Sequence, residues 1–294
     1  MITLAAGLAT TFGAALVFIV KPEDDKKFSV FLALSAGVMV FLCFSEMIPE
    51  AIECFEQHLR DGSNDLSDSQ IEKRAQNYAT LWFFAAVLLC AIVDMGGEWI
   101  VKRKAKRMNE ERATPSCVEE AGDLYNEEKQ NASIKVDDTA KSPSNNLVTM
   151  AIFSAIALTI HNFPEGVSTF IANAKENSFG PAMAIAIGLH NIPEGVAVAL
   201  PVLKATGSKW RAFTLATLSG VAQPVAAIFA WLIIRDKLSP VVEACIYSFI
   251  AGMMVYIATI KLYPCALAFD QEKASIWFLL GLASMGASLI LFKI

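Results

Sequence analysis

Eight long apolar segments dominate this chain and leave it few ways to fold. They cover residues 1–20, 28–48, 78–101, 147–171, 181–203, 213–234, 241–263 and 275–292. Each is about as long as the roughly 18–20 residues that a helix needs to cross the hydrocarbon core of a bilayer. The segments are continuously apolar and do not alternate with a period of two, so they predict helices and not a transmembrane barrel. We therefore expect an all-α polytopic membrane protein with eight transmembrane helices.

The composition narrows the function classes further. Of the 294 residues, 55% are hydrophobic and 18% are charged, and the mean hydropathy of +0.47 excludes an ordinary soluble domain. The formal net charge is -5, and the dense basic cluster from Lys102 to Arg107 directly follows an apolar segment, as a membrane flank does. We expect a lipid bilayer and no nucleic acid among the partners. The six cysteines form no readable disulfide framework or Cys-x-x-Cys metal site.

The polar connections divide the chain into three parts. Residues 1–101 hold the first three helices with an acidic connection at 50–77, and residues 147–294 hold the fourth to eighth helices. Between them, 102–146 is charged and poor in aromatic residues, which predicts a flexible loop. Lysine and arginine gather after the first, third and fifth segments and place those connections in the cytoplasm. Both termini and the 50–77 connection are then expected on the other side.

One six-residue pattern, His-Asn-x-Pro-Glu-Gly, occurs twice, at His161 to Gly166 and at His190 to Gly195. The copies lie near the middle of the fourth and fifth segments. Consecutive spans run antiparallel, so the two copies have opposite directions in the membrane. This arrangement is typical of an inverted repeat whose binding site lies at mid-depth, between helices four and five.

The spacing within each copy suits a metal ion. Residues four apart share a helix face, so His161 lies beside Glu165 and His190 beside Glu194. Two imidazoles and two carboxylates from two helices are enough for the inner ligands of zinc, ferrous iron or manganese. A single such residue could serve packing alone. A carboxylate at mid-bilayer costs about 2.5–3.5 kcal/mol on insertion scales, however, so the doubled motif favours a compensating cation.

These motifs resemble those of the ZIP (Zrt/Irt-like) family of divalent-metal transporters, and most of all its compact ZupT-type branch. The segments Phe44 to Pro49, Pro201 to Lys209 and Ser219 to Ala222 are also similar to that branch. The resemblance implies a two-metal site that moves Zn²⁺, or Fe²⁺, Mn²⁺ or Cd²⁺, toward the cytoplasm. It implies His161, Glu165, His190 and Glu194 as the main ligands, with Asn162 and Asn191 joining the glutamates at the second metal.

The chain departs from the branch at two positions. Gln223 stands where the branch usually has a glutamate, and Ile260 and Lys261 stand where it usually has an acidic pair. Both changes remove negative charge, and Lys261 adds a positive charge, so a second dication would bind more weakly. We expect one well-formed metal site and a weak or absent second one. Lys261 either lies near the metal path or extends to the membrane interface. Glu46 is either a ligand at the outer mouth of the path or an interfacial residue, and Asp94 either guides exit or lies at a solvated helix end.

The leading hypothesis is a transporter that works by alternating access. We expect no enzyme activity, no catalytic residue and no cofactor, with the metal as transported substrate. No nucleotide-binding loop is present in the sequence, so an ion gradient and not ATP would drive transport. The alternatives are an intramembrane metal-dependent hydrolase and a metal sensor that does not transport. The protein is expected to be integral and multi-pass, in the plasma membrane or an organelle membrane, and a homodimer is left open.

Overall fold

The computed structural model describes residues 2–19, 24–62, 66–113, 159, 162–171, 179–233 and 239–293, and every regular element in these ranges is helical. This confirms the all-α prediction. The elements are α1 (Ile2–Ala15), η1 (Leu16–Phe18), α2 (Asp25–Leu42), η2 (Cys43–Met47), α3 (Ile48–Gly62), α4 (Asp68–Ala113), a helix at 162–171, α6 (Phe179–Thr206), α7 (Lys209–Ile233), α8 (Pro240–Tyr256), η4 (Ile257–Leu262), α9 (Tyr263–Phe269) and α10 (Gln271–Lys293).

Several of these helices are long and apolar enough to cross a membrane. Within the described ranges there are five, at Lys26–Gly62, Asp68–Gly97, Lys209–Ile233, Pro240–Phe269 and Gln271–Leu291, and a shorter apolar helix at Thr3–Phe18. Large apolar side chains such as Leu81, Phe84 and Leu88 of α4 are exposed, as they are on lipid-facing helices. The protein is therefore a multi-pass membrane protein. The total of eight spans stays a prediction, because much of the 147–171 segment lies outside the described residues.

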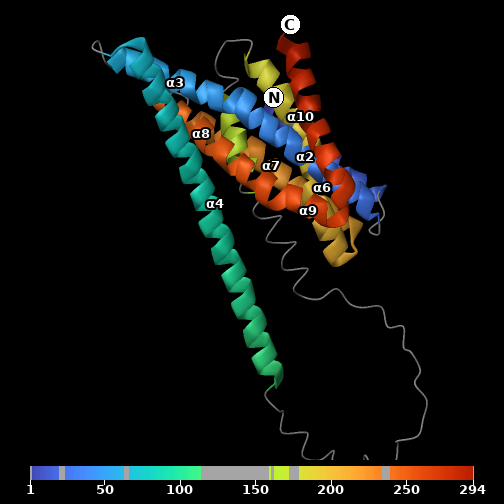
Figure 1. Cartoon of the computed structure of the whole chain (residues 1–294). Helices are drawn as coiled ribbons and strands as arrows, with labels where there is room; N and C mark the ends of the chain where they lie inside the picture. Colours follow the sequence, from blue (N-terminus) through green and yellow to red (C-terminus); the bar gives the residue numbers. More distant parts are fainter. Residues whose placement is uncertain are drawn as a thin grey trace, which may run out of the picture.

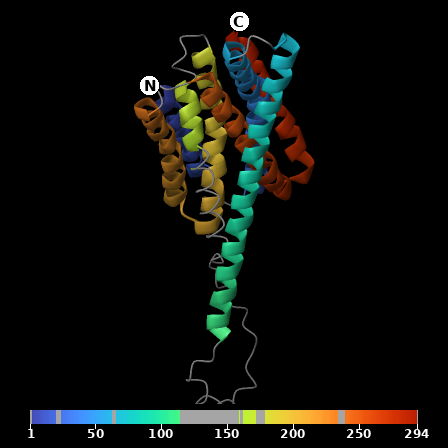
Figure 2. The same ribbon diagram turned by 90° about the vertical axis from the view of Figure 1, so that its left-hand side faces the viewer.

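The long helix α4 is the most visible departure from a compact bundle. In Figures 1 and 2 it extends well beyond the other helices at one end, while both termini lie toward the end at which α3 turns into α4. The placement of both termini at one end agrees with an even number of spans. Since α4 continues to Ala113, helix occupies the first part of the predicted 102–146 loop, and residues 114–146 lie outside the described part.

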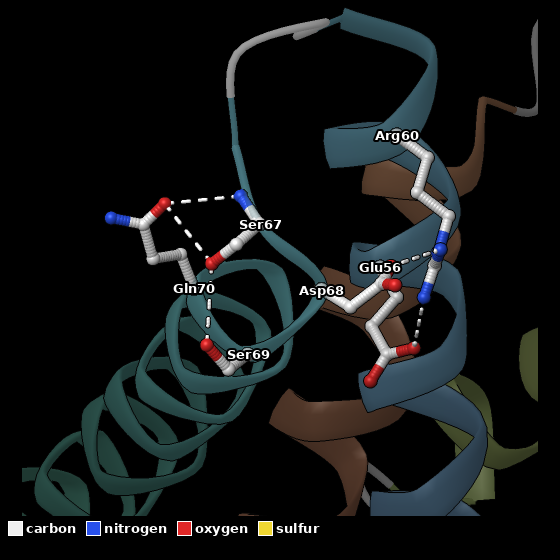
Figure 3. A network of polar contacts seen from close by, with 6 residues as sticks. All are labelled: Glu56, Arg60, Ser67, Asp68, Ser69 and Gln70. Atoms are coloured by element: carbon white, nitrogen blue, oxygen red, sulfur yellow. Dashed lines mark hydrogen bonds and ion pairs between the residues drawn. The ribbon is translucent and has the colours of Figure 1, made fainter.

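The turn between α3 and α4 is held by polar contacts within the predicted 50–77 connection, which is mostly helical (Figure 3). Arg60 of α3 pairs with Asp68 at 2.7 Å and with Glu56 at 3.8 Å. Ser67 caps α4, and its backbone N–H donates to the side-chain oxygen of Gln70 at 3.0 Å. These contacts fix the antiparallel entry of α4 against α3.

Two helices share an unusual interruption. The helix from α2 to α3 contains a π-helical segment, η2, which ends two residues before Pro49. The helix from α8 to α9 contains another, η4, which ends two residues before Pro264. Proline removes a backbone donor, and the wider turn lets the preceding carbonyls find other partners. The two long helices are thus equivalent halves of a repeat.

Close glycine contacts show the same repeat. A Cβ on Gly7 of α1 would lie 2.6 Å from the carbonyl oxygen of Gly220 of α7, and one on Gly220 would lie 2.6 Å from that of Gly7. Gly37 of α2 meets the Phe278 carbonyl of α10, as Gly252 of α8 meets the Phe83 carbonyl of α4. Equivalent helices therefore pair in equivalent ways, α1 with α7, and α2 with α10 as α8 with α4. This pairing agrees with an internal repeat, and its inverted orientation stays a prediction.

The contacts divide the helices into two groups. The first, called the motif group below, consists of α1, the helix at 162–171, α6 and α7, which pack on one another. The second, called the outer group, consists of α2, α3, α4, α8, α9 and α10 with η2 and η4. Helix α6 joins the two groups through its contacts with α2 and α10.

Candidate metal site

The two motifs place four polar side chains in the interior of the motif group. Asn162 and Glu165 lie on the helix at 162–171, and Asn191 and Glu194 lie on α6. Each is at most 1% exposed. Burying such groups between apolar helices is unfavourable unless they form hydrogen bonds or bind a counter-ion. The hydrogen bonds that they form therefore show which of their atoms remain available to a ligand.

The two asparagines make equivalent hydrogen bonds. The Asn162 amide donates to the Ser219 carbonyl of α7 at 3.2 Å and to the Ser219 hydroxyl at 2.9 Å. The Asn191 amide donates to the Ala6 carbonyl of α1 at 3.0 Å and to the Gln223 side-chain oxygen at 2.9 Å. In the described part of the chain neither asparagine oxygen accepts a hydrogen bond, so both remain available to a cation.

The glycine that ends each motif brings its helix against a neighbour. A Cβ on Gly166 would lie 2.2 Å from the Gln223 carbonyl oxygen of α7, and one on Gly195 would lie 2.0 Å from the Thr10 carbonyl oxygen of α1. No side chain fits at such a distance. Close helix packing therefore requires the glycine at the end of each motif, and this packing holds the preceding glutamate in place.

The two carboxylates form the electrostatic centre of the site. Glu194 lies close enough to Glu165 for the two charges to repel, and Asn162 lies beside Glu194. Within the described ranges neither oxygen of Glu194 accepts a hydrogen bond by distance and angle. Because Glu165 and Glu194 are buried carboxylates whose charges repel, the arrangement favours a bound cation as counter-charge.

The two imidazoles lie outside what the structure describes. His161 is not described, and of His190 only the backbone is, within α6. In the described residues no three histidine, cysteine, aspartate or glutamate side chains form a group that could hold a metal. The metal roles of His161, Asn162, Glu165, His190, Asn191 and Glu194 therefore remain predictions.

A family model described as "ZIP Zinc transporter" matches residues 1–289 of the chain. This chain belongs to the ZIP family. Curated relatives named "Zinc transporter ZupT" are 33% identical in Streptococcus mutans and 34% identical in Corynebacterium aurimucosum, each aligned over 99% of this chain and 96% of the relative. A relative of the same name in Chlorobium chlorochromatii is 32% identical over the same shares. ZIP proteins are transporters, which leaves no support for the hydrolase alternative.

Within this ZIP protein, Gln223 is buried in the motif group and contacts both motifs. It is 1% exposed, its side-chain oxygen accepts from Asn191, and its carbonyl contacts Gly166. Its own amide nitrogen makes no hydrogen bond in the described part. The side chain presents a neutral amide at the centre of the motif group, which supports the prediction of a weak second metal site.

Lys261 has a partner that the sequence did not reveal. It forms an ion pair with Asp94 of α4, whose other oxygen accepts from the Tyr256 hydroxyl at 3.1 Å. Lys261 stands three residues before Pro264 in η4, as Glu46 stands three residues before Pro49 in η2. The repeat therefore has opposite charges at equivalent positions. The Glu46 side chain is buried, with 3% of its surface exposed. The Lys261 side chain is paired with Asp94 of α4, which also belongs to the outer group.

Sequence reasoning missed one neighbour of the site. Cys43 begins η2, is fully buried and lies close enough to Glu165 for an electrostatic interaction. In the sequence, Cys43 is one of several cysteines within apolar segments and carries no sign of a role at the site. The signal that could have found it is the run Cys43 to Pro49, which carries a buried carboxylate and a proline near the end of a span.

Proposed function

We propose that this protein moves Zn²⁺ across a membrane toward the cytoplasm through the site between the two His-Asn-x-Pro-Glu-Gly motifs, with Fe²⁺, Mn²⁺ and Cd²⁺ as competing substrates. The observation that carries the proposal is the pair Glu165 and Glu194, two buried carboxylates on neighbouring helices of a membrane protein. A dication neutralises both charges at once. The asparagine oxygens can add neutral ligands, and His161 and His190 supply imidazoles in the proposed site.

The arrangement of the helices supports alternating access. The motif group is held together by backbone contacts at Gly7, Gly166, Gly195 and Gly220 that leave no room for side chains. In the described part of the chain, α6 contacts α2 and α10 of the outer group, and Glu165 lies near Cys43 of η2. We infer that the motif group moves as a unit against the outer group and carries the metal between the two sides. Protonation of a ligand would release the metal, since metal ligands must be deprotonated.

The proposed site holds one metal well. A second dication beside Glu165 and Glu194 would meet the Gln223 amide in place of a carboxylate. An amide oxygen donates less charge than a carboxylate, and here it already accepts a hydrogen bond from Asn191. The second position is therefore weak.

Uptake of radioactive zinc into proteoliposomes tests the proposal. The wild-type protein should take up Zn²⁺, and Glu194→Gln should reduce the initial rate by at least about tenfold. Glu243→Gln is the matched control, because Glu243 is a buried carboxylate of the outer group. Full uptake by Glu194→Gln would contradict the proposal, and binding without flux in the wild type would favour a metal sensor.

A further inference from the structure

Thr10 of α1 has a buried hydroxyl for which the described residues provide no hydrogen bond. The residue is 0% exposed, and its Oγ1 finds no partner in the described part of the chain. A helical threonine can donate its hydroxyl to the carbonyl four residues earlier. This bond forms, at 2.6 to 3.3 Å, at Thr11, Thr169, Thr206 and Thr259. Thr217 of α7 is a second threonine whose Oγ1 has no partner in the described part.

At Thr10 the second motif competes for the carbonyl that the hydroxyl would otherwise use. The carbonyl four residues earlier is that of Ala6, which accepts the helical N–H of Thr10. The same carbonyl also accepts the Asn191 amide at 3.0 Å. Both lone pairs of the Ala6 oxygen are thus occupied, one of them by the second motif. The Thr10 hydroxyl is left with unused hydrogen-bonding capacity next to that motif.

Thr10 occupies on α1 the place that Gln223 occupies on α7. Asn191 binds the carbonyl of Ala6, four residues before Thr10, and Asn162 binds the carbonyl of Ser219, four residues before Gln223. Gly195 meets the carbonyl of Thr10 as Gly166 meets that of Gln223. The inverted repeat therefore brings positions 10 and 223 to the same centre from opposite halves. Gln223 fills its position with an amide, and Thr10 offers a hydroxyl.

We propose that the Thr10 hydroxyl is an additional neutral oxygen ligand of the metal site and shifts its selectivity toward oxygen-preferring dications. The inference rests on the proposed function for the location of the metal. Hydroxyl and carbonyl oxygens suit Mn²⁺ better than the softer Cd²⁺. The Thr10 hydroxyl adds an oxygen but no charge to a site that already contains the carboxylates of Glu165 and Glu194. Removing this oxygen should therefore weaken Mn²⁺ binding more than Cd²⁺ binding.

Binding of Mn²⁺ and Cd²⁺ to the full-length protein in detergent tests this directly. Free Mn²⁺ is followed by electron paramagnetic resonance while Cd²⁺ competes for the site. Thr10→Val, which keeps the shape of the side chain, should lower the affinity for Mn²⁺ relative to Cd²⁺ by about tenfold. Thr10→Ser keeps the hydroxyl and should stay within about twofold of the wild type. Thr11→Val is the matched control, because the Thr11 hydroxyl bonds to Gly7 of its own helix.

A purely structural threonine predicts a different result. Replacing an unpaired buried hydroxyl with a methyl group should leave the affinity ratio unchanged and the thermal stability equal or higher. An unchanged ratio in Thr10→Val, or an equal shift in Thr11→Val, overturns the proposal. If Thr10→Val does not purify as a folded protein, Thr10→Ala provides the same comparison. Binding without uptake in the wild type would refute transport but leave the ratio test intact.

Discussion

The side chain of Asn191 bonds to the side chain of Gln223 across 2.9 Å, joining the second motif to the helix that packs against the first. The same amide reaches the Ala6 carbonyl of α1. One asparagine therefore connects three helices of the motif group. Its partner Gln223 places a neutral amide where the proposed second metal would bind.

Replacing Gln223 by glutamate should restore a second metal position. A carboxylate at this place can still accept the Asn191 amide and adds the negative charge that a second dication needs. We expect the number of Zn²⁺ ions bound per chain, measured by elemental analysis after dialysis, to rise from one toward two. Gln271→Glu at the exposed start of α10 is the control. An unchanged count in Gln223→Glu would argue against the neutral-amide explanation.

Gly195→Ala should destabilise the protein strongly. The added methyl would lie 2.0 Å from the Thr10 carbonyl oxygen, so α1 and α6 must separate at a cost of roughly 1–3 kcal/mol or more. A Cβ at Gly188 on the same helix would meet no heavy atom of the described residues within 4 Å. Gly188→Ala should match the wild type or gain roughly 0.5–1 kcal/mol from helix propensity. Thermal unfolding in detergent compares them, and equal losses would show that the close contact is unimportant.

The ion pair between Lys261 and Asp94 should appear as a coupling in a double-mutant cycle. Lys261→Met leaves Asp94 with the Tyr256 hydroxyl as its remaining bond, and Asp94→Asn leaves a lysine in a membrane helix without its counter-charge. The double variant removes both charges and should be more stable than the sum of the single effects predicts, by roughly 0.5–3 kcal/mol. Strict additivity in thermal unfolding would mean that the pair contributes nothing.

The sequence alone was sufficient to predict those features of the protein that depend on local sequence pattern. Apolar segments of membrane length predicted the helices, and the repeated motif singled out the asparagines and glutamates of both copies, which the structure buries in the motif group. The partners of those residues could not be predicted in this way. Asn191 binds residues 185 and 32 positions away, and Lys261 binds one 167 positions away. Such contacts depend on how helices pack.

The π-helical segments and the length of α4 were also not predicted from the sequence. The sequence analysis predicted no interruption of the helices near Pro49 and Pro264, where η2 and η4 lie. The charged residues after 101 suggested a loop, although lysine, arginine and glutamate are good helix formers and continue α4 to Ala113. Thr10 and Thr11 stand side by side in an apolar segment, and only the structure shows that Thr10 is buried near the contact of Asn191 with Ala6 while Thr11 bonds to Gly7.

Locating Zn²⁺ by anomalous scattering in crystals of the zinc-loaded protein tests the central claim most directly. We predict the strongest peak between the two motifs, with carboxylate oxygens of Glu165 and Glu194 at about 2.0–2.2 Å from the metal. The peak should disappear in Glu194→Gln crystals grown under the same conditions. A strongest peak elsewhere, for instance between Cys54 and Glu243 at the junction of α3 and α8, would contradict the account.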